Sequence, residues 1–160
     1  MHVVQTELIV PFIDATKSTF AIILKKQVKQ KEVYIKKSSA MFGDISGSLD
    51  LTGERTGTIA VSLPADFALS CIREMIGEDD DIALSTTVVH NGIGEVIAMI
   101  AESAKTTLVS TGHSIEFATP TITSGRGHEL QHVPEATNTS IIFVTDQDEE
   151  FALDVCIQPQ

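Results

Sequence analysis

The fold is decided by residues 88–107, which read Val-Val-His-Asn-Gly-Ile-Gly-Glu-Val-Ile-Ala-Met-Ile-Ala-Glu-Ser-Ala-Lys-Thr-Thr. Apolar residues recur in this stretch at steps of three and four, which predicts a long amphipathic helix. Since a helix turns by about 100° per residue, the polar positions gather opposite the apolar stripe. The stripe comprises Val89, Ile93, Val96, Ile97, Ile100, Ala104 and Leu108, and the opposite, solvent-directed face comprises Asn91, Glu95, Ala98 and Glu102.

Two glycines, Gly92 and Gly94, lie in the first turns of this predicted helix. Each costs roughly 1 kcal/mol there relative to alanine. Either another backbone approaches the helix closely at this point, or packing within the domain leaves no room for a side chain. The sequence leaves both interpretations open.

The length and charge of the chain narrow the class of protein. We expect one domain over residues 1–160. The formal net charge of −11 argues against nucleic acid and against anionic membranes, both of which attract Lys and Arg. No apolar run of about 18 residues and no leader pattern is present. Cys71 and Cys156 lie in apolar settings, so we expect two core thiols in a reducing cytoplasm.

The remaining elements predict an α+β domain, in which an antiparallel sheet of about six strands is covered by long helices. Period-two alternation marks the strands, and a Gly-containing connection marks one hairpin. In the last strand, Asp154 is expected to point outward. The predicted helices are 6–24 and one that starts at Pro64 and ends just before Gly77. The predicted strands lie within 25–37, 43–52, 56–63, 114–124 (which contains Pro120), 140–145 and 151–157.

The segment 25–37 is basic, with six of the chain's eleven Lys and Arg residues and a single acid, Glu32. Lysines commonly protect an edge strand from mispairing, so an edge strand is the first interpretation. A partner-binding patch is the alternative.

His128-Glu129-Leu130-Gln131-His132 matches the His-Glu-x-x-His string of zinc proteases, which requires a helix. Glycines precede the string and Pro134 follows it, so a loop or strand rim is predicted instead. The acidic run 78–81 lacks the spacing of a calcium loop. We therefore expect no metal site.

Residues 94–101 with 104–106 are similar to the signature helix of the CheC/CheX/FliY phosphatases of bacterial chemotaxis. The similarity is closest to CheX and extends over most of the chain, through 11–16, 45–48, 57–69 and 120–128. It implies a CheC-like fold, a CheY-type response-regulator receiver as partner and substrate, and a homodimer formed through sheet edges. It also implies no cofactor of the chain's own, since any Mg²⁺ would be carried by the receiver.

The motif of that family places an Asp or Ser one turn before a Glu, an Asn one turn after it, and a Pro farther along. The Glu pairs with a lysine at the receiver's active site, and the Asn positions the attacking water. Glu95 and Pro120 match this motif, whereas Asn91 stands at the Asp/Ser position and Ala98 at the Asn position. A methyl group cannot orient water by hydrogen bonding. Glu102, one turn farther, would bring a carboxylate towards an anionic phosphoryl group.

Three hypotheses follow from this incomplete match. The chain docks on a receiver through Asn91, Glu95, Ala98, Glu102 and Pro120 but has lost most or all phosphatase activity. Alternatively, it is an active phosphatase in which Asn91 or Glu102 positions the water. The third hypothesis is a structural or sensory homodimer without a receiver partner.

Overall fold

The computed structural model describes residues 6–77, 83–130 and 136–158. The long helix predicted from the sequence is present as α3, Thr86–Ser110. It begins after Ser85, whose side-chain oxygen accepts the backbone N–H of Val88 and so caps the first turn. Near its end, Gly112 adopts a φ of +93°, which only glycine adopts without strain.

The described strands form one sheet in the order β1-β6-β7-β3-β2-β4, with β5 also paired to β2, and all pairs are antiparallel. The α+β prediction is therefore confirmed, with seven strands in place of about six. The elements are α1 Thr6–Ile22, β1 Val28–Ile35, β2 Ile45–Gly53, β3 Gly57–Leu63, α2 Ala65–Ile76, β4 Ile115–Phe117, β5 Thr121–Ser124, β6 Thr137–Thr145 and β7 Glu150–Ile157.

The additional strand arises at Pro120. The single strand predicted over 114–124 is divided into β4 and β5, which pair with successive parts of β2. Proline has no N–H to donate to the ladder, so the pairing stops before Pro120 and resumes at Thr121. The chain therefore stays beside β2 on both sides of the interruption.

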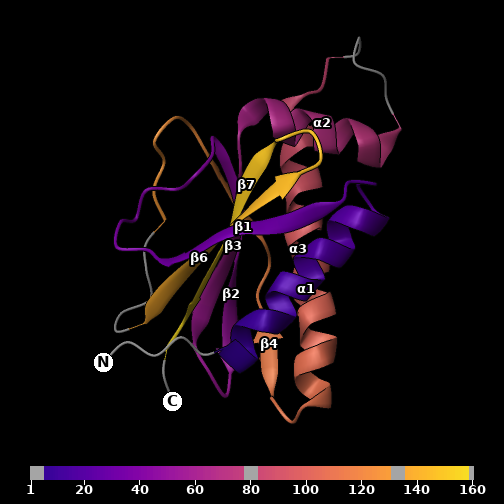
Figure 1. Ribbon diagram of the computed structural model, residues 1–160. Coiled ribbons are helices and arrows are strands. Elements are labelled where there is room, and N and C mark those ends of the chain that lie inside the picture. The colour runs from indigo at the N-terminus through magenta and orange to yellow at the C-terminus, as the bar shows by residue number, and fades with distance from the viewer. Residues whose placement is uncertain (1–5, 78–82, 131–135, 159–160) are drawn as a thin grey trace.

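One face of the sheet is covered by α1 and α3, and α2 lies beside the N-terminal end of α3 (Figure 1). The core lies between these layers. A Cβ added to Gly47 of β2 would lie 3.0 Å from Cγ2 of Ile93 in α3. The absence of a side chain at this position allows α3 to approach the sheet closely.

Four stacked phenylalanines join the helices to the sheet. Phe151 of β7 is their centre, with its ring centroid 4.2 Å from Phe20 of α1, 5.7 Å from Phe67 of α2 and 5.2 Å from Phe143 of β6. All four rings are buried. Buried aromatic pairs contribute stability beyond the area they remove from water, so this cluster joins α1 and α2 to the sheet at one point.

The other face of the sheet carries a buried ion pair. Asp154 of β7 lies on this face, as predicted, but it is buried because Lys36 covers it, with Nζ 2.8 Å from Oδ2. Nearby, the backbone N–H of Met41 donates to the carbonyl of His128 at 3.0 Å. The segments after β1 and β5 thus lie against each other over this face.

β1 is an edge strand, as predicted, because it pairs with β6 at the end of the strand order. Four of the six lysines of this region face carboxylates of the same chain, which offsets much of the positive charge. The pairs are Lys25–Glu74, Lys26–Glu149, Lys31–Glu150 and Lys36–Asp154.

Candidate functional site

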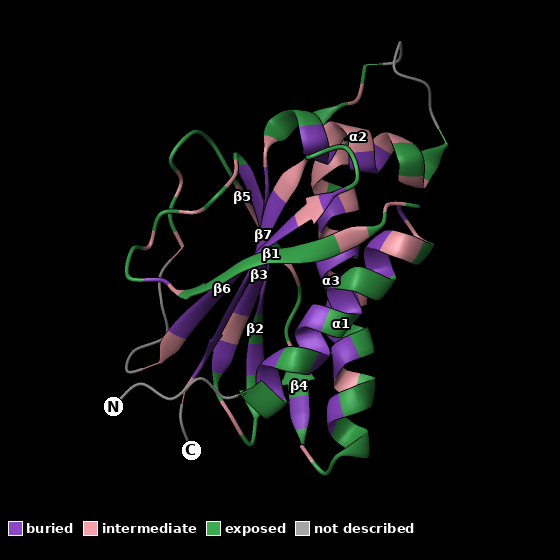
Figure 2. Cartoon of the chain, viewed as in Figure 1, coloured by how far each residue is buried: buried purple, intermediate pink, exposed green. Residues whose placement is uncertain are grey.

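The polar face of α3 is open to solvent, as its periodicity predicts. Asn91, Glu95 and Glu102 are exposed and Ala98 is half-buried, whereas the apolar stripe opposite is buried apart from the half-buried Val89 (Figure 2). The same helix therefore serves two purposes. One side builds the core, and the other presents two carboxylates and an amide to any molecule that approaches.

Pro120 lies against this helix although it is remote from it in sequence. A Cβ built on Gly94 would lie 3.8 Å from Cβ of Pro120 and 3.8 Å from Cδ1 of Ile122. Pro120 therefore flanks α3 at the level of the turn that carries Glu95 and Ala98. The residues that the family motif connects are thus brought together on one side of the molecule.

The charges of this face leave Glu95 unneutralised. Among the described residues, its carboxylate and the Asn91 amide take part in no side-chain hydrogen bond or ion pair. Lys105, two turns beyond Ala98, donates to Glu116 of β4 at 2.8 Å, and this hydrogen bond raises the pKa of Lys105. The face can therefore receive a cationic side chain at Glu95, but it offers no hydrogen-bonding group at Ala98.

The glycines of α3 are explained by packing within the domain at one position only. A Cβ on Gly92 would lie 2.3 Å from Cδ1 of Ile72, so α2 occupies the space that a side chain would need. At Gly94 a Cβ would make only ordinary contacts. At Gly92, packing within the domain therefore explains the missing side chain, and the approach of another backbone is not needed.

The zinc-protease string has no helix in its described part. His128, Glu129 and Leu130 lie outside any helix, and Nε2 of His128 lies 2.7 Å from the Ser46 hydroxyl. Gln131 and His132, like the acidic run 78–81, lie outside the described residues. Within the described ranges, no three His, Cys, Asp or Glu side chains gather as metal ligands would.

The two cysteines are core residues, as predicted, and both are buried. Burial raises the pKa of the Cys71 thiol to about 12. A thiol with this pKa stays protonated at neutral pH and is a poor nucleophile. Nucleophilic chemistry at Cys71 is therefore not favoured.

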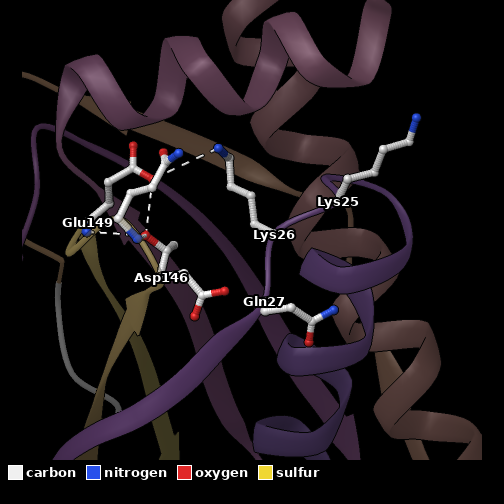
Figure 3. A pocket seen from close by; sticks show the side chains of 7 residues that line it. Lys25, Lys26, Gln27, Asp146 and Glu149 are labelled. Atoms are coloured by element: carbon white, nitrogen blue, oxygen red, sulfur yellow. Dashed lines mark hydrogen bonds and ion pairs between the residues drawn. The ribbon is translucent and has the colours of Figure 1, made fainter.

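A polar pocket of about 170 Å³ lies where the segment between α1 and β1 meets the turn between β6 and β7 (Figure 3). Lys26 faces Glu149 at 3.9 Å, whereas Lys25 points away from the pocket, towards Glu74. Asp146 adds a further carboxylate to the lining. Since the carboxylates offset the lysine charge, this pocket is a weaker candidate for a phosphate-bearing ligand than the basic segment alone indicates.

The fold and the carboxylate-bearing face of α3 together define a CheC-like α+β protein. The family model described as chemotaxis phosphatase CheX matches residues 45–144. The chain therefore belongs to the CheX family, as its signature helix indicated.

Solved structures agree with this assignment. CheX from Desulfovibrio desulfuricans is 30% identical, with a TM-score of 0.86 over 95% of this chain and 99% of that one. CheX from Vibrio vulnificus is 25% identical, with a TM-score of 0.84 over 95% and 99%. A CheX–CheY–BeF₃–Mg²⁺ complex from Borrelia burgdorferi has a chain 20% identical, with a TM-score of 0.80 over 95% and 98%, which shows the shared fold. No curated protein sequence matches the chain.

Two features of the folded chain were not predicted from the sequence. One is the buried Lys36–Asp154 pair, and the other is an apolar pocket beside the N-terminal end of α3. Each is assembled from segments far apart in the chain, so no local pattern signals it.

Among the described residues, no helix has the length and apolar character needed to cross a membrane.

Proposed function

We propose that this chain docks on a CheY-type receiver domain through the exposed face of α3, and that its phospho-aspartate phosphatase activity is reduced or lost. The observation that carries the proposal is the unneutralised, exposed Glu95 beside Pro120, with a methyl group at Ala98. Asn91 and Glu102 complete the contact surface along the helix.

Receiver docking is supported by charge and by family. A receiver's active-site lysine would find its counterion in Glu95, and a charge-assisted pair of this kind orients the two proteins. The related Borrelia burgdorferi CheX was crystallised with CheY, BeF₃ and Mg²⁺. We propose further that any Mg²⁺ would be carried by the receiver and that the chain works in the cytoplasm.

Reduced catalysis is proposed from Ala98. Phosphoryl transfer to water depends mainly on positioning and electrostatics. A methyl group holds no water, and losing one positioning group commonly costs on the order of 10²-fold in rate. The carboxylates of Glu95 and Glu102 do not replace an amide that donates to the phosphoryl oxygens.

The test measures binding and hydrolysis separately, with the phosphorylated receiver of the same organism. The wild type should bind the BeF₃-activated receiver and accelerate phosphate release weakly or not at all. Ala98→Asn should raise the release rate by about 10²-fold. The matched control is Val109→Asn, which adds the same amide to an exposed position near the end of α3 and should change nothing.

Two other results would select the other hypotheses. Rapid phosphate release by the wild type would mean an active phosphatase, and Asn91→Ala and Glu102→Ala would then identify the residue that positions water. If the wild type binds no receiver, the docking proposal fails and a structural or sensory role remains.

We also propose a homodimer formed through a sheet edge. The free side of β1 supports it, since β1 pairs only with β6 in the described chain, and Val33 is 46% exposed at its centre. Sedimentation equilibrium should show a dimer that Val33→Asp weakens. A monomer at all concentrations, or a dimer that the substitution leaves intact, would contradict pairing at this edge.

A further inference from the structure

We propose that an apolar pocket at the N-terminal end of α3 is a second anchoring point for the receiver, where it takes one large apolar side chain of that partner. The inference rests on the proposed docking function. The pocket has a volume of about 280 Å³. Its floor is formed by the buried Ile45 and Ala68, and its walls by the half-buried Leu69, Leu84 and Val89.

The pocket is continuous with the face that carries Glu95. β5 begins beside Pro120, which flanks Gly94, and ends at Ser124, which lines the pocket together with His90 of α3. The strand therefore runs along the helix from the docking face to the pocket. The side of the pocket formed by His90 and Ser124 therefore adjoins the proposed contact surface.

A protein interface of ordinary size that is centred on Glu95 would reach the pocket. Five residues separate His90 from Glu95, a rise of about 7.5 Å along the helix. A standard interface covers about 800 Å² on each partner, which corresponds to a patch roughly 30 Å across. A receiver centred on Glu95 would therefore also cover the mouth of the pocket.

The chemistry of the pocket selects an apolar occupant. Its interior is aliphatic, and Asp44, the one carboxylate among the described residues of its lining, already accepts the backbone N–H of Ala65 at the start of α2 at 2.8 Å. Large anchoring side chains that fill well-packed, desolvated pockets, aromatic ones among them, carry much of the binding energy of protein interfaces. The charged contact at Glu95 would orient the receiver, and the pocket would supply affinity.

The experiment measures the Kd of the BeF₃-activated receiver for two pocket variants of the full chain. Leu84→Asp places a charge in the pocket just before the start of α3, where an acidic residue is compatible with the helix dipole. Ala65→Phe fills the pocket from its exposed rim without adding charge. The matched control is Ile22→Asp, because Ile22 is 72% exposed on α1 and lies outside the pocket lining.

Both pocket variants should weaken receiver binding by roughly tenfold to a hundredfold, and Ile22→Asp should leave it unchanged. Thermal melting checks that each variant folds. If Leu84→Asp does not fold, the Kd of Ala65→Phe alone tests the anchoring inference. If the wild type binds the receiver and a folded pocket variant binds it equally well, the anchoring inference is overturned while the docking function stands. If the wild type binds no receiver, both fail.

Discussion

The buried ion pair between Lys36 and Asp154 allows a quantitative test of the fold. Nζ and Oδ2 lie 2.8 Å apart, and each side chain is only 7% exposed. Among the described residues, Oδ1 of Asp154 has no hydrogen-bond partner, and the Lys36 ammonium makes one further contact, with the Met41 sulfur at 3.4 Å. The pair is therefore well shielded from water but incompletely satisfied.

Lys36→Met keeps the length of the side chain and removes its charge, which leaves a buried carboxylate without a counterion. Breaking a buried pair in this way costs about 3–5 kcal/mol. For a chain of this size, each kcal/mol lowers Tm by about 2–4 °C, so the expected loss is roughly 6–20 °C. The double variant Lys36→Met/Asp154→Leu removes both charges and should melt close to the wild type, because the desolvation cost disappears with the attraction.

Differential scanning calorimetry and urea unfolding at neutral pH measure these differences. The matched control is Lys31→Met, which breaks a pair with Glu150 whose side chains are 52% and 34% exposed. An exposed pair of this kind contributes little to stability, because water screens it. The reasoning would be refuted if Lys36→Met cost no more stability than this control, or if the double variant lost as much stability as Lys36→Met alone.

Three further substitutions have defined outcomes. Phe151→Ala removes the centre of the phenylalanine stack and should cost about 3–5 kcal/mol in urea unfolding, and a loss below 1 kcal/mol would contradict its central role. Ser85→Ala removes the cap of α3 and should cost about 1 kcal/mol, seen as a lower Tm, whereas an unchanged Tm would count against the cap. The backbone N–H of Ser114 donates to Glu54 and holds the pKa of this carboxyl below its ordinary 4.5. The ionised carboxylate therefore stabilises the fold above pH 4.5, and this stabilisation is lost as the pH falls through the lower pKa of the folded state. Glu54→Gln should therefore lower stability at neutral pH and match the wild type in acid, and a gap independent of pH would contradict the assignment.

The sequence predicted those features whose causes are local. The apolar period of α3 and the glycine after α2, Gly77, indicated two helices correctly, and Gly77 adopts the left-handed φ of +74° that ends α2. The polar face with Glu95 followed from the same period. The division of one predicted strand at Pro120 was not foreseen, because a proline in a strand pattern signals an edge, an end or a bulge without deciding among them.

Features assembled from distant segments could not be predicted in this way. Lys36 and Asp154 are 118 positions apart, and nothing near either residue indicates its partner. The contact of Pro120 with α3 was expected only from the family motif, because the hydrophobic pattern does not say which strand end meets which helix turn. The apolar pocket combines α2, α3 and the ends of β2 and β5, so it exists only in the folded chain.

The two sides of α3 also bear on how such a protein evolves. Substitutions at exposed helix positions usually change stability by less than about 0.5 kcal/mol, whereas those on the buried stripe are costly. Asn91, Glu95 and Glu102 lie on the permissive side and Ala98 at its margin. Selection can therefore change the chemistry of this exposed face one codon at a time, while the buried stripe beneath it stays constant.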